Sequence, residues 1–100
     1  MTEAGGTTTF RLVNNAGAFP LYELKNSSVS DAEVITIPTA SPVTATSLVI
    51  VVGALSETSE NQLGDGELTI EYVKANRAFT VGEGSLSDKV VRILFYVVQE

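Results

Sequence analysis

Turn-forming residues divide this chain into short segments, and that division is the feature that most constrains its fold. Glycine, asparagine or proline interrupts the sequence at intervals of roughly 8–15 residues, the spacing expected of a sandwich or small barrel. The segments between them are rich in valine and threonine, whose β-branched side chains favour strands. The sequence therefore predicts an all-β fold, an antiparallel β-sandwich of jelly-roll or immunoglobulin-like kind with about seven strands.

The alternation of apolar and polar residues places the expected strands. They span residues 8–13, 21–25, 32–37, 43–54, 67–73, 77–81 and 88–99. In residues 67–73 the apolar side chains of Leu68, Ile70 and Tyr72 are expected to face the core. Polar residues 26–31 predict a loop, and residues 59–63 could form one helical turn. Residues 1–7 predict a flexible arm, and residues 8–100 a single domain.

Two of the expected strands are apolar on both faces. Residues 48–52 carry no polar side chain, and residues 90–98 carry only one charge, that of Arg92. A strand of a lone sandwich needs only one apolar face. If about five such side chains stayed exposed, the protein would lose on the order of 10 kcal/mol of the stabilising free energy that their burial provides. We therefore expect a homo-oligomer, unless the segment 56–66 or the arm covers these strands. The expected interface residues are Val49, Val51, Val91, Ile93, Phe95 and Val97.

Composition excludes several classes of function. Cysteine, histidine and tryptophan are all absent, which removes disulfides, imidazole catalysis and the usual zinc sites. The formal net charge of −6 argues against nucleic acid or an anionic membrane as partner. No nucleophile motif or phosphate-binding glycine loop is present. The sequence predicts a protein that is not an enzyme and has no cofactor and no catalytic or metal-binding residue.

Acidic residues are the remaining candidates for site chemistry. Glu57, Glu60, Asp65 and Glu67 cluster in a polar stretch, but no calcium-binding motif accompanies them. A solvated acidic loop is therefore expected, and calcium binding by residues 56–66 stays open. Glu67 and Glu71 would lie about 13 Å apart along one strand face, too far for a glycosidase pair.

The amino end lacks the basic start and apolar core of a signal peptide. The longest uninterrupted apolar run, residues 48–55, is far shorter than the about 20 residues of a membrane helix. We therefore expect no membrane partner and a cytoplasmic location. The sequence Asn26-Ser27-Ser28 matches a glycosylation sequon, which we interpret as a chance match in a serine-rich chain.

In its general type the chain resembles small β-sandwich proteins of bacteriophage virions, such as capsid decoration proteins. The resemblance lies in an acidic, Thr/Ser/Val/Ala-rich chain without Cys, His or Trp, and in the polar amino-terminal arm and two-faced apolar strands. It implies a non-enzymatic structural protein, located in the virion, that forms trimers or similar clusters and binds capsid subunits or another assembly protein. It also implies that Thr7, Thr8 and Thr9 belong to an arm that contacts the partner by strand addition.

The alternative is a small binding module. Such a domain would recognise a glycan or a protein through its loops, with residues 14–17, 26–31 and 56–66 as the contact candidates. The two interpretations differ in oligomeric state, because the module would be a monomer.

Overall fold

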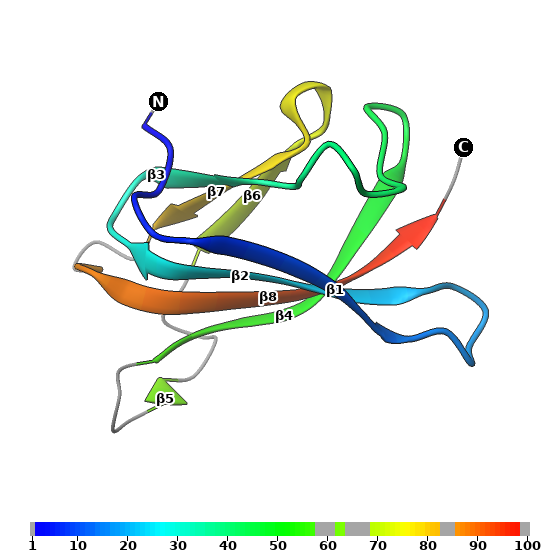
Figure 1. The fold of residues 1–100 in the computed structure, drawn as a ribbon, viewed down its shortest axis with the longest axis horizontal. Coiled ribbons are helices and arrows are strands. Elements are labelled where there is room, and N and C mark those ends of the chain that lie inside the picture. The colour runs from blue at the N-terminus through cyan, green and yellow to red at the C-terminus, as the bar shows by residue number, and fades with distance from the viewer. Residues whose placement is uncertain (1, 58–61, 64–68, 83–85, 99–100) are drawn as a thin grey trace.

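The computed structural model describes residues 2–57, 62–63, 69–82 and 86–98, which form two antiparallel sheets packed face to face (Figure 1). The larger sheet contains, in spatial order, β1 (Thr8–Asn14), β2 (Leu21–Val29), β8 (Lys89–Val98), β4 (Leu48–Glu57) and the two-residue β5 (Gln62–Leu63). The smaller sheet has the order β3 (Glu33–Thr36), β7 (Ala78–Gly82), β6 (Thr69–Val73). The predicted all-β sandwich is confirmed.

The core lies between the two sheets and is centred on aromatic side chains. Phe79 of β7 and Phe95 of β8 are fully buried, and their ring centroids are 5.3 Å apart across the two layers. Tyr72 of β6 packs beside Phe79 at 4.8 Å, and Ile70 also contacts the core, as the alternation of residues 67–73 predicted. Leu68 lies outside the described residues.

Two strand boundaries differ from the prediction, for local reasons. Residues 26–29, predicted to be loop, continue β2, because Asn26 pairs with Val91 and Val29 with Lys89 of β8. The predicted strand at 43–47 is instead a turn before β4. The backbone N–H of Ser47 donates to the carbonyl oxygen of Thr44 at 3.1 Å, and the hydroxyl of Ser47 accepts from the N–H of Thr44 at 3.0 Å.

Other boundaries shift by one or two residues. Ala32 has a φ of 66° in the turn between β2 and β3, so β3 begins at Glu33. Of the expected helical turn at 59–63, residues 59–61 lie outside the described part, and Gln62–Leu63 form β5. A 3-10 turn, Lys74–Asn76, connects β6 to β7, and no α-helix occurs in the described ranges.

The amino-terminal segment is bound to the sandwich, which corrects the prediction of a flexible arm. The N–H of Val34 donates to the carbonyl oxygen of Thr2 at 2.9 Å, and the N–H of Ala4 donates to the carbonyl oxygen of Val34 at 2.8 Å. These bonds form a short parallel bridge along β3, and the side chain of Ala4 is buried in the core. Residues 2–4 therefore cover what would otherwise be the open edge of β3 (Figure 1).

A candidate assembly surface

The predicted interface residues of β8 face the inside of the chain's own sandwich. Val91, Ile93 and Phe95 are fully buried and Val97 is nearly so, which corrects their expected place between subunits. Side chains of β8 alternate between its two faces, and these four residues belong to the set that points into the core. The opposite face of β8 carries Val90, Arg92, Leu94, Tyr96 and Val98. Of the two predicted residues on β4, Val49 packs against the core and Val51 is 40% exposed.

Exposed apolar side chains gather at one end of the larger sheet. Eight large apolar residues of the described chain are between 36% and 55% exposed. They come from the β1–β2 hairpin, the first half of β4 and the end of β8: Leu12, Val13, Phe19, Leu48, Ile50, Val51, Val52 and Tyr96. We call these residues the apolar end. Strand pairing places them at the same end of the sheet but on both of its faces, since Leu12 pairs with Tyr22 on the inner face and Leu21 pairs with Tyr96 on the outer face.

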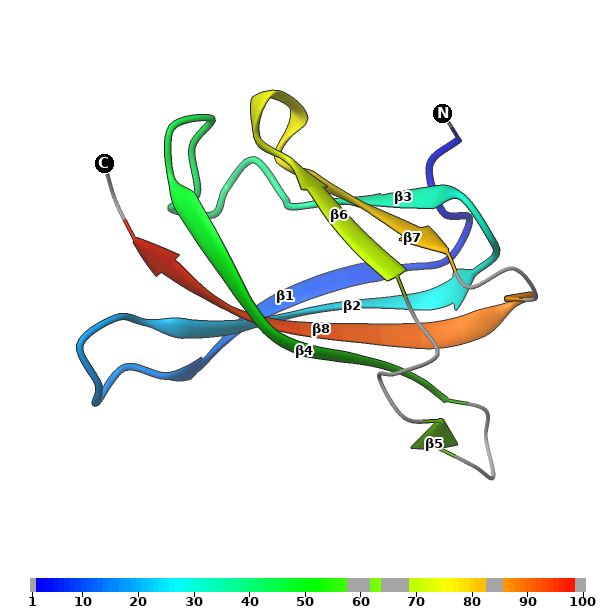
Figure 2. The same ribbon diagram turned by 180° about the vertical axis from the view of Figure 1, so that it is seen from behind.

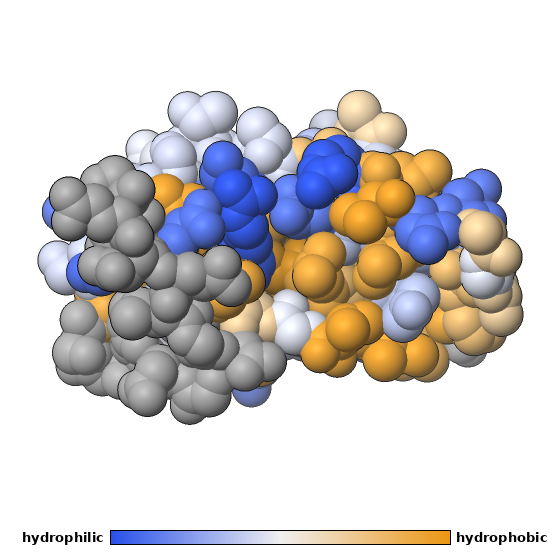
Figure 3. Space-filling view, turned by 90° about the horizontal axis from the view of Figure 1, so that it is seen from below, coloured by the Kyte–Doolittle hydropathy of each residue, from blue (hydrophilic) through white to orange (hydrophobic). Residues whose placement is uncertain are grey.

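The outer face of the larger sheet shows part of this surface. Ile50 on β4 lies directly opposite Tyr96 on β8, and Leu48 lies opposite Val98. In Figure 3, which views this face, apolar residues (orange) predominate on the right half of the view, beyond a hydrophilic stretch and with some hydrophilic residues among them. If a large apolar residue offers about 150–250 Å² when fully exposed, the apolar end leaves on the order of 600 Å² uncovered. Because these residues lie on both faces of the sheet, one contact would cover only part of that area, and a standard interface takes about 800 Å² from each partner.

The apolar end is also built from sequence without charge. Residues 12–22, 34–56 and 93–98 contain no Asp, Glu, Lys or Arg. These three segments supply all the residues of the apolar end. In a chain of net charge −6, two copies repel one another over much of their surface. The apolar end is the place where that repulsion is weakest.

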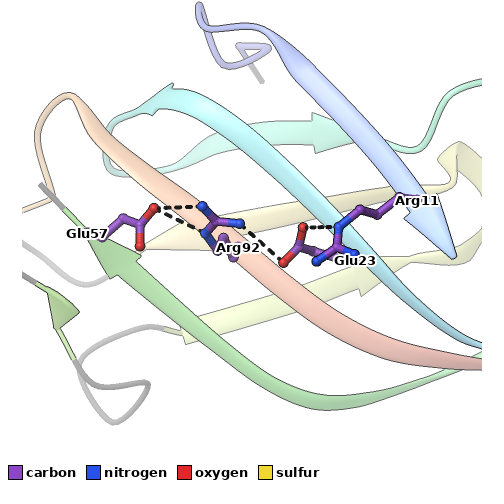
Figure 4. A network of polar contacts seen from close by, with 4 residues as sticks. All are labelled: Arg11, Glu23, Glu57 and Arg92. Carbon is purple, nitrogen blue, oxygen red and sulfur yellow. Dashed lines mark hydrogen bonds and ion pairs between the residues drawn. The ribbon is translucent and has the colours of Figure 1, made fainter. Parts of the chain in front are cut away.

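A row of ion pairs crosses the same outer face and borders the apolar surface (Figure 4). Nε of Arg11 on β1 lies 3.0 Å from Oε1 of Glu23 on β2, and Nη1 of Arg92 on β8 lies 3.3 Å from Oε2 of the same carboxylate. Nη2 of Arg92 also lies 3.1 Å from Oε1 of Glu57 on β4. The row therefore joins four neighbouring strands of the larger sheet.

The two central members of the row have shifted pKa values. Burial of Glu23 acts to raise the pKa of its carboxyl, but hydrogen bonds and charge from Arg11 and Arg92 outweigh it and lower that pKa. The hydrogen bond to Glu57 raises the pKa of Arg92 further, against the effect of burial. Both shifts favour the charged forms of Glu23 and Arg92, and the members of the row satisfy one another rather than an external ligand.

The threonines predicted to contact a partner are bonded to β2, and their contact with a partner stays a prediction. Thr8 and Thr9 belong to β1 and pair with Asn26 and Lys25 of β2. The N–H of Thr7 donates to the hydroxyl of Ser27 at 2.8 Å. This corrects their expected place in a free arm.

No other arrangement in the described residues suggests catalysis or metal binding. Groups of three or more Asp, Glu, His or Cys side chains able to hold a metal are absent there. Most of the acidic stretch, including Glu60, Asp65 and Glu67, lies outside the described part. A depression of about 330 Å³ lies beside the amino-terminal segment, lined by Glu3, Val34, Thr36, Asn76 and Ala78. Its one carboxylate, Glu3, already accepts hydrogen bonds from the N–H and hydroxyl of Thr36.

Within the described residues, no helix has the length and apolar character needed to cross a membrane. No family model, curated protein or solved structure matches this chain. The resemblance to virion proteins therefore stays a prediction, and the apolar end is the feature on which a function can be argued.

Proposed function

We propose that this protein is a non-enzymatic structural protein that self-assembles through its apolar end, and that it serves as a virion component such as a capsid decoration protein. The single observation that carries self-assembly is the gathering of eight exposed large apolar residues at one uncharged end of the larger sheet. Large apolar side chains exposed in one region of a protein mark an interaction site or an aggregation hazard. If copies of the same chain cover these residues, the residues serve as an interaction site and the aggregation hazard is removed.

The virion assignment rests on a different kind of support. It follows from the general resemblance in composition and sandwich fold, together with the self-assembly surface. Expression beside candidate capsid proteins and gradient purification of the resulting particles tests it. We expect the protein to sediment with the particles. Its recovery only at the top of the gradient, with intact particles below, would contradict the assignment and leave self-assembly standing.

Sedimentation velocity at micromolar concentration tests self-assembly directly. We expect the wild-type chain to sediment as a stable multimer. Tyr96→Lys places a charge on the outer face of the apolar end and is expected to shift the protein towards monomer. Thr9→Lys adds the same charge at an exposed position of β1 away from that end, and is expected to leave the multimer intact.

Two results would count against the proposal. A wild-type monomer across the micromolar range contradicts self-assembly and favours the binding module. Equal effects of Tyr96→Lys and Thr9→Lys would mean that charge in general, rather than the apolar end, controls association. Circular dichroism of both variants confirms that the sandwich is intact.

A further inference from the structure

The first half of β4 is an edge strand with apolar side chains on both faces. From Leu48 to Leu55, β4 pairs with β8 on one side. On its other side β5 pairs only with Ser56 and Glu57, and the described residues provide no further strand there. A row of backbone N–H and C=O groups therefore faces outward along residues 48–55, ready to pair with another strand.

Natural sheets usually protect such edges with charge, proline, a bulge or a covering segment. The other edges of this protein have such protection. Arg11 lies on the edge strand β1, residues 2–4 cover β3, and Glu71 lies on β6. β4 has neither charge nor proline before Glu57. Its bulge between Val51 and Gly53 comes only after the first four residues of the strand.

We infer that this edge pairs with the same edge of a second copy, antiparallel and about a two-fold axis at Ile50. The free segment has natural limits on both sides, since the strand begins at Leu48 and the bulge after Val51 bends it. An axis at Ile50 pairs Val49 with Val51 of the other copy and brings Leu48 opposite Val52, the residue at the bulge. The inference rests on the proposed self-assembly and names the edge that carries it.

A second copy fits this edge because neither the edge nor its exposed side chains carry a charge. A two-fold axis brings each surface against itself, so any charge near the axis would meet its own sign. The segment 34–56 contains none. Ile50 of one copy would lie beside Ile50 of the other on the outer face, next to Tyr96 of each. Pairing of the two edges covers the exposed apolar residues of β4 that lie along it, whereas Leu12 on the far edge strand stays outside the contact.

Single cysteines test the pairing, because the natural chain has none. An axis at Ile50 places its two Cα atoms about 5 Å apart, within the range of a disulfide. The two Leu48 Cα atoms would lie about 14 Å apart along the strand direction, beyond that range. Leu48 and Ile50 are 42% and 45% exposed, so Leu48→Cys is a matched control. We expect mild oxidation with diamide to link Ile50→Cys into dimers, and Leu48→Cys to remain unlinked.

A charge at the axis provides a second measurement. Ile50→Lys places two lysines opposite each other, and we expect the dimer dissociation constant to rise at least about tenfold. Leu12→Lys changes a residue of similar exposure, 49%, on the opposite edge strand, and a smaller rise is expected there. Circular dichroism verifies that both variants are folded.

The outcomes separate this inference from the proposed function. Multimers that form without cross-linking at Ile50, or with equal cross-linking at Leu48, overturn the β4 pairing and leave self-assembly intact. A larger disruption of the multimer by Leu12→Lys than by Ile50→Lys would also overturn the β4 pairing and leave self-assembly intact. A wild-type chain that is monomeric at every concentration overturns both.

Discussion

Asn26 and Gly6 are in direct contact where the amino-terminal segment crosses β2. The side-chain amide of Asn26 donates to the carbonyl oxygen of Gly6 at 3.3 Å and to the hydroxyl of Thr8 at 2.9 Å. Its oxygen accepts from the N–H of Ser28 at 2.9 Å. Asn26 is fully buried, so these bonds satisfy an amide that would otherwise be costly to bury. This contact fastens the segment to the sandwich, and it explains why the sequon asparagine is a structural residue.

Gly6→Ala is expected to loosen the amino-terminal segment. A Cβ atom at Gly6 would collide with the backbone nitrogen of Ser28 and the side-chain oxygen of Asn26, whereas a Cβ at Gly5 meets open space. We expect Gly6→Ala to lower the free energy of unfolding by about 1–3 kcal/mol and Gly5→Ala to change it little. Urea unfolding measures the difference. We also expect amide hydrogen exchange at residues 2–7 to become faster in Gly6→Ala and not in Gly5→Ala, which would locate the loss of stability in the amino-terminal segment. Equal stability of the two variants would contradict the contact.

Asn26→Ala removes the other partner of the same contact. The variant leaves the N–H of Ser28 and the carbonyl of Gly6 without their buried partner, so a loss of about 2–3 kcal/mol is expected. Asn14→Ala is the control, because Asn14 is exposed and its side chain accepts only a local bond from the N–H of Ala16 at 2.7 Å. We expect a loss below about 1 kcal/mol there. If thermal or urea unfolding gives similar losses for Asn26→Ala and Asn14→Ala, the buried position of Asn26 adds nothing to stability.

The sequence predicts the sheets better than the segments between them. The alternation in residues 67–73 and the β-branched runs identify strands because side chains there follow the two-residue period of a pleated sheet. This two-residue period does not identify the end of β2. Asn26 and Ser27 are polar, and a period-based prediction assigns them to a loop. They remain in the strand because the buried amide of Asn26 finds partners on Gly6 and Thr8, a long-range arrangement that no local pattern reveals.

The candidate site was predicted in kind but only partly in position. Two-faced apolar strands indicated an uncovered surface, and Ile50 and Tyr96 are exposed as that pattern requires. On β8, however, both faces are apolar, so the alternation of apolar and polar residues does not show which face is inward. One other signal is present: Arg92 is the only charge in residues 90–98 and marks the outer face, on which Leu94 and Tyr96 also lie. Reading the phase from Arg92 places Val91, Ile93 and Phe95 in the core.

Glu23→Gln is expected to change how stability depends on pH. The pKa of Glu23 is lower in the folded chain than its ordinary value, so its ion pairs favour folding above that ordinary value. The contribution is lost as pH falls through the lowered pKa, because protonation removes the charge. We expect the variant to be less stable than wild type by about 1–2 kcal/mol at pH 7, and the difference to shrink below about pH 4.

Urea unfolding at pH 7, 5, 4 and 3 measures this difference. Glu71→Gln is the control, because Glu71 is an exposed carboxylate on β6. We expect Glu71→Gln to follow the wild-type pH dependence throughout. A deficit of Glu23→Gln that is the same at pH 7 and pH 3 would instead mean that packing, rather than the charge shared with Arg11 and Arg92, is lost.

Phe79→Leu tests whether the aromatic contact joins the two sheets. Phe79 is fully buried between Tyr72 and Phe95, so the smaller side chain leaves a void and removes two ring contacts. We expect a loss of about 1–2 kcal/mol in the free energy of unfolding. Phe19→Leu makes the same exchange at a residue that is 43% exposed, and a change within about 0.5 kcal/mol is expected. Both are measured at one protein concentration, because self-association stabilises the folded chain by mass action. If Phe19→Leu proves the more destabilising of the two, the hairpin end rather than the space between the sheets is the principal source of stability.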